Sequence, residues 1–172
     1  MVRRMFRMGL VVALSALALL MSACGLDVRA DASQGIARFL DAVRRGDRQG
    51  FEASIDRPAL RSDLSGQLAE LGRASGVDVG DPSEFALDRM ITPDAFSLVE
   101  ARTGQALPIA PTAAQVALLM TVRDPNHACV GDQATHRCLL SFAKRDGVWR
   151  LVGMRATDLK IALPPEPKAA KR

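Results

Sequence analysis

The spacing of apolar residues changes once along this chain, and this change restricts the fold more than any other feature. In the first half apolar side chains recur every three or four positions, as Ile36, Leu40 and Val43 do, which is typical of amphipathic helices. From residue 116 onward they alternate with a period of two, as in strands. Helices followed by strands predict an α+β fold, with N-terminal helices packed on a C-terminal antiparallel meander of three to four strands.

The helical half carries local signals for the helix ends. Ser33 is a suitable N-cap for the first helix, and Gly46 is a suitable left-handed end. Asp47 caps a short helix, and Asp56 followed by Pro58 starts a longer one that we expect to run through residue 73. The apolar stripe of this helix is expected to lie in the core and consists of Leu60, Leu64, Leu68 and Leu71.

Carboxylates between residues 78 and 84 allow two interpretations. Asp78, Asp81 and Glu84 could suggest calcium, but they lack the regular spacing of a calcium loop. We prefer Asp81 as a helix N-cap, with Glu84 in a capping-box-like position. A further helix is expected to start at Thr92 and to end near residue 102.

The second half is predicted to hold the meander. We expect strands at residues 116–122, 138–143 and 148–154, and a short fourth strand at 158–163. Asp146-Gly147 predicts a tight hairpin turn between the second and third strands.

Residues 9–24 have the pattern of an export signal. Three arginines precede an apolar run that is too short to span a membrane, and small residues then lead to Cys24. The ending Met21-Ser22-Ala23-Cys24 resembles a bacterial lipoprotein box, which implies that Cys24 is acylated and becomes the mature N-terminus. The alternatives are an ordinary signal peptide with an incidental cysteine, and a twin-arginine signal at Arg3-Arg4.

These features divide the chain into four parts. Residues 1–23 are the expected lipoprotein signal peptide, 24–32 a tether, 33–163 a single α+β domain and 164–172 a disordered tail rich in proline and charge. An anchor at Cys24 implies a location in the cell envelope, facing the periplasm. Gly25 stands where an inner-membrane retention signal has aspartate, so we prefer the outer membrane.

The formal net charge of +4 does not indicate a nucleic-acid partner. Three of the 23 lysines and arginines lie in the signal, which leaves 20 against 19 acidic residues in the mature chain. Aromatic residues make up 4% of the chain and tyrosine is absent, so few side chains could stack on bases. We therefore expect no binding of nucleic acid.

Two His-x-Cys pairs at the ends of one loop are the strongest candidates for a chemical site. Two cysteines and two histidines can hold zinc in a tetrahedral site. In an exported chain such cysteines more often form a disulfide, and we prefer a Cys129–Cys138 bridge to zinc or free thiols. His127 and His136 are then loop residues without a ligand role.

Signals for catalysis are missing from the sequence. It contains no nucleophile elbow, phosphate-binding loop or dinucleotide fingerprint. Asp47 and Asp56 could form a carboxylate pair, but each has a sufficient role as a helix cap. Arg57 and Arg61 could bind an anion, although a solvated face is the simpler interpretation. We predict no catalytic residue, no metal site and no cofactor.

Two family resemblances can be stated from these residues. The stretch 46–68 resembles the opening of a bacterial family, domain of unknown function 2939, and the stretches 91–96 and 145–152 also fit. The matching residues of the first stretch are Gly46, Asp47, Asp56, Pro58, Ala59, Leu60 and Arg61. The closing strand–turn–Trp–strand pattern is similar to the nuclear-transport-factor-like cone, in which a curved sheet wraps a helix around a pocket. The first resemblance implies fold and compartment, and the second implies fold alone.

Two classes of function remain. The first is a lipid-anchored envelope protein, attached to the membrane through Cys24, that binds an envelope protein or an apolar ligand, or supports envelope structure. The alternative is a small hydrolase or isomerase with a pocket in a cone-shaped sheet. Such a pocket needs convergent polar groups, and the expected strands are nearly all apolar, which favours the first class.

Overall fold

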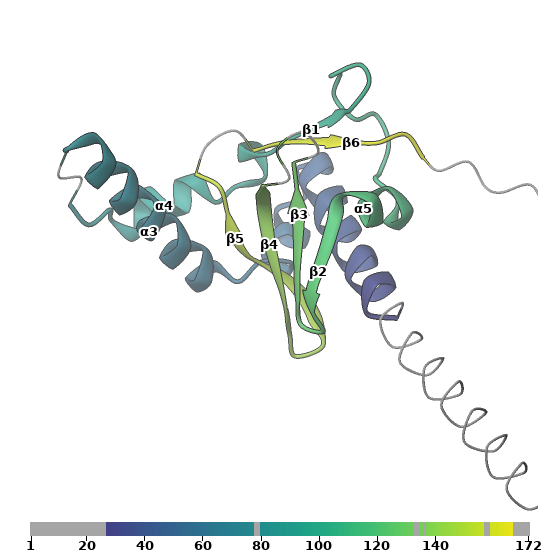
Figure 1. Cartoon of the computed structure of the whole chain (residues 1–172), viewed down its shortest axis with the longest axis horizontal. Coiled ribbons are helices and arrows are strands. Elements are labelled where there is room, and N and C mark those ends of the chain that lie inside the picture. The colour runs from purple at the N-terminus through teal and green to yellow at the C-terminus, as the bar shows by residue number, and fades with distance from the viewer. Residues whose placement is uncertain (1–26, 78–79, 133–134, 136, 157–158, 167–172) are drawn as a thin grey trace, which may run out of the picture.

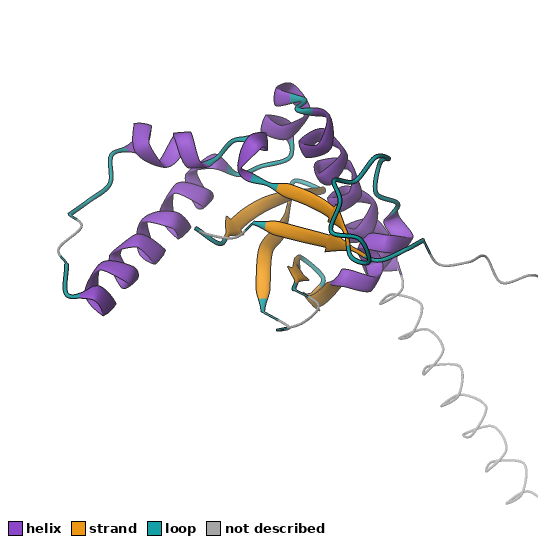
Figure 2. Cartoon of the chain, turned by 90° about the horizontal axis from the view of Figure 1, so that it is seen from above, coloured by secondary structure: helices purple, strands orange, loops and turns teal. Residues whose placement is uncertain are grey.

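The computed structural model of the chain describes residues 27–77, 80–132, 135, 137–156 and 159–166. The fold is α+β, as predicted: helices come first, and an antiparallel four-stranded sheet follows, with a small parallel sheet beside it. Figures 1 and 2 show the N-terminal helix packed along the sheet and a pair of helices that extends to one side. The expected signal peptide, Cys24 and residues 167–172 of the tail lie outside the described residues.

The N-terminal helix covers residues 27–45 and begins earlier than predicted. Its apolar stripe is buried, as expected, and consists of Ile36, Phe39, Leu40 and Val43. Ser33 is not the N-cap, because it lies inside the helix and its hydroxyl donates to the carbonyl of Ala30. The segment expected to be a tether is helical from residue 27, since Arg29 and Asp31 bond to the folded domain and hold this turn in place. Gly46 follows the helix with a φ of 62°, as predicted.

The next two helices, α2 (Arg48–Ala53) and α3 (Arg57–Ser75), begin at the predicted caps. The Asp47 and Asp56 carboxylates each accept a hydrogen bond from the backbone N–H of the third helical residue, at 2.9 and 3.2 Å. These bonds satisfy N–H groups that have no partner within the helix. Both aspartates therefore act as caps.

The leucine stripe of α3 is buried only in its first half. Leu60 and Leu64 are fully buried, Leu68 is partly buried and Leu71 is 53% exposed. The prediction for Leu71 is wrong because the second half of α3 extends away from the sheet, as Figure 1 shows.

After α3 the chain returns to form α4 (Glu84–Met90), whose N-cap is Ser83 and not Asp81. The Ser83 hydroxyl accepts a hydrogen bond from the helix backbone, so Ser83 has the capping role that we expected for Asp81. The predicted helix from Thr92 to about residue 102 is wrong. A single 3-10 turn is followed there by the strand β1 (Ser97–Glu100), which pairs with a strand more than 60 residues later.

The strand predicted at residues 116–122 is divided between two elements. Its first part belongs to the helix α5 (Ala113–Leu119) and its second part to β2 (Met120–Asp124). The helix is favoured by a capping box, in which Thr112 and Gln115 exchange hydrogen bonds between side chain and backbone.

The main sheet has the order β2-β3-β4-β5, and all its neighbours are antiparallel. Its other strands are β3 (His127–Gly131), β4 (Cys138–Arg145) and β5 (Val148–Met154). The Asp146-Gly147 turn joins β4 to β5 as predicted, with φ values of 51° and 78° that suit a type I′ turn. The loop predicted around Cys129 is instead β3, because its backbone pairs with strands on both sides.

The predicted fourth strand is present as β6 (Lys160–Leu163), but it pairs in parallel with β1 and does not join the meander. The core contains four phenylalanine rings, and the ring pairs in contact have centroids 5.4–5.9 Å apart. They are Phe39, Phe51, Phe96 and Phe142. Because the first ring comes from the N-terminal helix and the last from β4, this cluster holds the helix against the sheet.

Candidate functional site

A disulfide joins Cys129 in β3 to Cys138 at the start of β4, with the two Cα atoms 5.7 Å apart. The strands are hydrogen-bonded neighbours with a register shift at Gly131, so the sheet itself brings the cysteines together. The loop between the strands is therefore closed covalently at its base. Cys24, the predicted lipid attachment site, lies outside the described residues.

His127 and the two cysteines do not form a metal site among the described residues. His127 begins β3, and its exposed ring places Nδ1 2.8 Å from the carboxylate of Asp124. The pKa of Asp124 is lowered, first by the backbone N–H of Asn126 and then by His127. His136 lies outside the described residues. The described residues contain no group of three or more side chains suited to a metal, and the disulfide uses both sulfurs.

Two polar side chains of α3 bind the end of β5, an edge strand of the main sheet. The Asp63 carboxylate accepts a hydrogen bond from the backbone N–H of Met154 at 3.0 Å, and the Gln67 amide donates to the carbonyl of Met154 at 2.7 Å. Gln67 also accepts from the N–H of Ala156 at 3.0 Å. These bonds satisfy backbone groups that would otherwise need a further strand. Sequence reasoning missed this contact, because the partners are about 90 positions apart.

Three open hollows surround the same end of the sheet, and Arg155 lines all three. The first hollow has a volume of about 350 Å³ and the second about 330 Å³, and Gln67 lines both. Cys138 also lines the second hollow. The third, about 350 Å³, shares Leu139 with the second and extends to β6. These three neighbouring hollows share lining residues, and together they are called the Arg155 groove.

The third hollow brings together three cationic side chains from separate segments. Arg137 precedes β4, Arg155 follows β5 and Lys160 begins β6. Within the described part of the chain, none of the three side chains forms an ion pair or hydrogen bond. The backbone beside them is fixed, because the N–H of Arg155 donates to the carbonyl of Leu139, and the carbonyl of Arg137 accepts from Asp132. Asp132 also lines this hollow, so its three cations face one carboxylate. The excess of positive charge favours anionic groups.

Arg57 and Arg61 take part in an ion-pair network that holds α4 against α3. Arg61 bonds to the Asp88 carboxylate at 2.6 and 2.8 Å, and Arg57 bonds to it at 3.0 Å. Glu52 pairs with Arg57, and Glu84 pairs with Arg61. The hydrogen bond from Arg61, followed by that from Arg57, lowers the pKa of Asp88 to about 2. The sequence allowed two interpretations of Arg57 and Arg61, namely binding of an external anion and a position on a solvated face. Both are corrected, because the two arginines pair with carboxylates of this chain.

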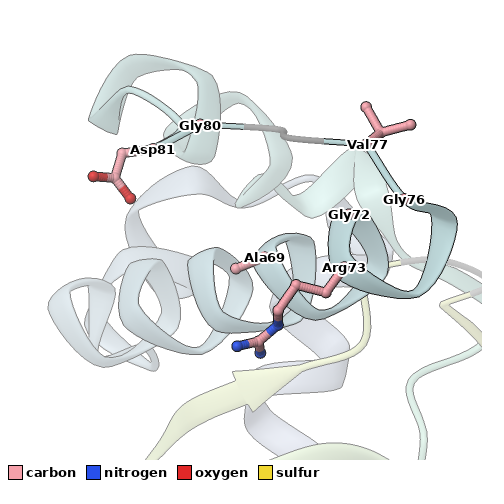
Figure 3. Close-up of a pocket in the computed structure, with 7 residues that line it drawn as sticks. All are labelled: Ala69, Gly72, Arg73, Gly76, Val77, Gly80 and Asp81. Atoms are coloured by element: carbon pink, nitrogen blue, oxygen red, sulfur yellow. The ribbon is translucent and has the colours of Figure 1, made fainter.

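A hollow of about 580 Å³ lies between the second half of α3 and the returning segment (Figure 3). Its lining includes Ala69 and Gly72 on α3 and Gly80 on the returning segment, and Figure 3 shows the side chain of Val77 pointing away from the helix. Small residues explain the space, since little side-chain volume fills it. Asp81 lines this hollow, whereas Asp78, the other aspartate of the calcium alternative, lies outside the described residues.

The described part of the core holds few polar side chains. Among the described residues, the buried polar side chains are those of Ser33 and Gln115, and neither ionises in the physiological range. Gln115 is used in the capping box and in a bond to the carbonyl of Pro164. The space beneath the sheet is filled by the phenylalanine cluster.

These surfaces belong to an α+β domain with a disulfide at the edge of the Arg155 groove. No family model, no curated protein and no solved structure matches the chain. Within the described residues, no helix has the length and apolar character needed to cross a membrane.

Proposed function

We propose that this chain is a bacterial lipoprotein of the cell envelope, anchored through acylated Cys24, and that its α+β domain is a binding module and not an enzyme. The preferred location is the outer membrane, facing the periplasm, because Gly25 replaces the aspartate of an inner-membrane retention signal. The resemblance to domain of unknown function 2939 belongs to the same proposal and adds no activity.

The pairing of the cysteines carries this proposal. The chain has three cysteines, and Cys129 and Cys138 are bonded to each other. Cys24, at the end of the export signal, is therefore the thiol that remains for a lipid. A disulfide is typical of proteins in an oxidising compartment, so the disulfide and the signal support the same location.

Replacement of Cys24 by serine tests the anchor. The variant is expected to lose incorporation of labelled fatty acid. It should then leave the membrane or remain an uncleaved precursor, because stable attachment requires more than one acyl chain. The double variant C129S/C138S is the matched control and should still incorporate lipid. Normal labelling and membrane attachment of Cys24→Ser would contradict the proposal.

The binding surface of the module is proposed to be the Arg155 groove, and its partner an anionic component of the envelope. Arg137, Arg155 and Lys160 line one hollow together with a single carboxylate, that of Asp132. The three cations form no ion pair within the described chain, which suits an anion better than the apolar ligand considered from the sequence. The mature chain is nearly neutral, so this attraction is local and does not follow from net charge.

Immobilised dextran sulfate is a suitable anionic probe for the groove. Arg155→Gln should elute at a lower salt concentration than the unmodified protein, because one of the three lining cations is lost and fewer counterions are displaced. Arg89→Gln removes an exposed cation of α4 outside the groove and is the matched control. Equal shifts in the two variants would show that binding follows net charge alone.

A further inference from the structure

The start of the N-terminal helix leaves little chain between the domain and the proposed anchor. Residue 27 is already helical, and three peptide units separate its Cα atom from that of Cys24. Even fully extended, these units reach about 11 Å. An acylated Cys24 would therefore hold residue 27 close to the membrane surface.

The first turn of this helix is fixed to the rest of the domain. Arg29 donates to the backbone carbonyls of Ala117 and Met120. The Asp31 carboxylate accepts hydrogen bonds from Lys144 at 2.7 Å and from the indole N–H of Trp149 at 2.9 Å. The helix start therefore cannot swing away without breaking bonds to α5, β2 and the β4–β5 hairpin.

The same contacts show which end of the domain lies beside the helix start. Lys144 and Trp149 flank the β4–β5 turn, and the N–H of Lys144 donates to the carbonyl of Asn126 in the β2–β3 turn. Figure 1 places both turns at the bottom of the sheet, where the helix start also lies, whereas α3 and α4 extend to the left of the sheet. We call residues 27–31, 123–127 and 144–148 the anchor end.

We infer that the anchor end lies against the phospholipid bilayer that holds the acyl chains of Cys24, and that the Arg155 groove faces away from it. This inference rests on the proposed lipid anchor. β5 runs from the anchor end to Met154, next to Arg155, and its seven residues span about 23 Å. The groove is therefore presented to partners in the periplasm at a fixed distance from the membrane.

Tether length, and not charge, sets this orientation. The anchor end carries four cationic and four acidic side chains, so it offers no net attraction to an anionic surface. They are Arg29, Arg123, Lys144, Arg145, Asp27, Asp31, Asp124 and Asp146. The orientation should consequently persist at high salt, where surface charges are screened.

Fluorescence quenching tests the inference with two matched labels on the acylated mature protein. Val148 at the anchor end and Phe85 on α4 are both exposed apolar residues, at 45% and 72%. Each is changed to cysteine and labelled, while the native disulfide stays oxidised. In phosphatidylcholine vesicles that contain a headgroup-quencher lipid, the label at 148 should lose fluorescence, and the label at 85 should not.

A longer tether provides the second measurement. Insertion of ten Gly/Ser residues after Leu26 adds a root-mean-square reach of about 17 Å, and it should abolish the difference between the two labels while acylation continues. Equal quenching at both positions in the acylated protein with its natural tether would overturn the inference and leave the proposed anchor intact. Mass spectrometry that finds no acyl group on Cys24 would overturn both.

Discussion

The Asp63 side chain satisfies a backbone group of the edge strand β5 that would otherwise need a neighbouring strand. Its carboxylate accepts from the N–H of Met154 and from the amide of Gln67, which itself bonds to the same edge of the sheet. From its position next to Leu64 in the sequence, this aspartate would be expected to tolerate replacement unless it had a partner. The structure therefore changes the expected effect of replacing it.

Asp63→Ala is expected to lower the free energy of unfolding by about 1–3 kcal/mol, because it leaves a partly buried backbone N–H without an acceptor. Ser62→Ala, at an exposed neighbouring position, should change it by about 0.5 kcal/mol or less. Urea denaturation of both variants provides the comparison. Similar small effects would mean that water replaces the carboxylate at no cost.

At the scale of elements, α3 combines two environments in one helix. Its first half packs on β5 and on α4, whereas its second half leaves the sheet and borders the hollow of about 580 Å³. The leucines recur at the same spacing throughout, so the difference arises from what lies opposite them and not from the helix itself.

Leu64→Ala should cost about 2–5 kcal/mol of stability, because it removes a fully buried side chain and leaves a cavity. Leu71→Ala makes the same chemical change where the side chain is 53% exposed, and it should cost about 0.5 kcal/mol or less. Thermal and urea unfolding of the pair would distinguish the two halves of α3. A large loss at Leu71 would indicate that a partner covers the projecting half.

The whole molecule depends on links between distant segments. Asp31 joins the N-terminal helix to the β4–β5 hairpin, β1 pairs with β6, and the disulfide closes the loop between β3 and β4. These links connect segments that lie far apart in the described chain.

Non-reducing peptide mapping of the exported protein should recover a peptide in which Cys129 is linked to Cys138. In the chain-entropy account, closing a ring of about ten residues contributes about 2.5–3 kcal/mol, so reduction should lower the midpoint of unfolding. Two free thiols after export would contradict this pairing. Release of zinc by a chelator, together with a lower melting temperature, would restore the metal alternative.

Local chemistry accounts for what the sequence alone determined. The caps at Asp47 and Asp56, the helix end at Gly46 and the Asp146-Gly147 turn depend on bonds and dihedral angles within a few residues. The order of helices before strands follows in the same way from hydrophobic period. Cys129 and Cys138 could be proposed as a pair from their spacing and the expected compartment.

The tertiary structure decided every feature whose partner is far away in the chain. Residues 97–100 become β1 because β6 pairs with them, and Arg57 and Arg61 pair with Asp88 because α4 folds back along α3. The groove likewise exists only because three separate segments end beside Arg155. Short-range preferences differ by small amounts of free energy, so long-range pairing and burial select among them, and only the folded chain shows which of them prevail.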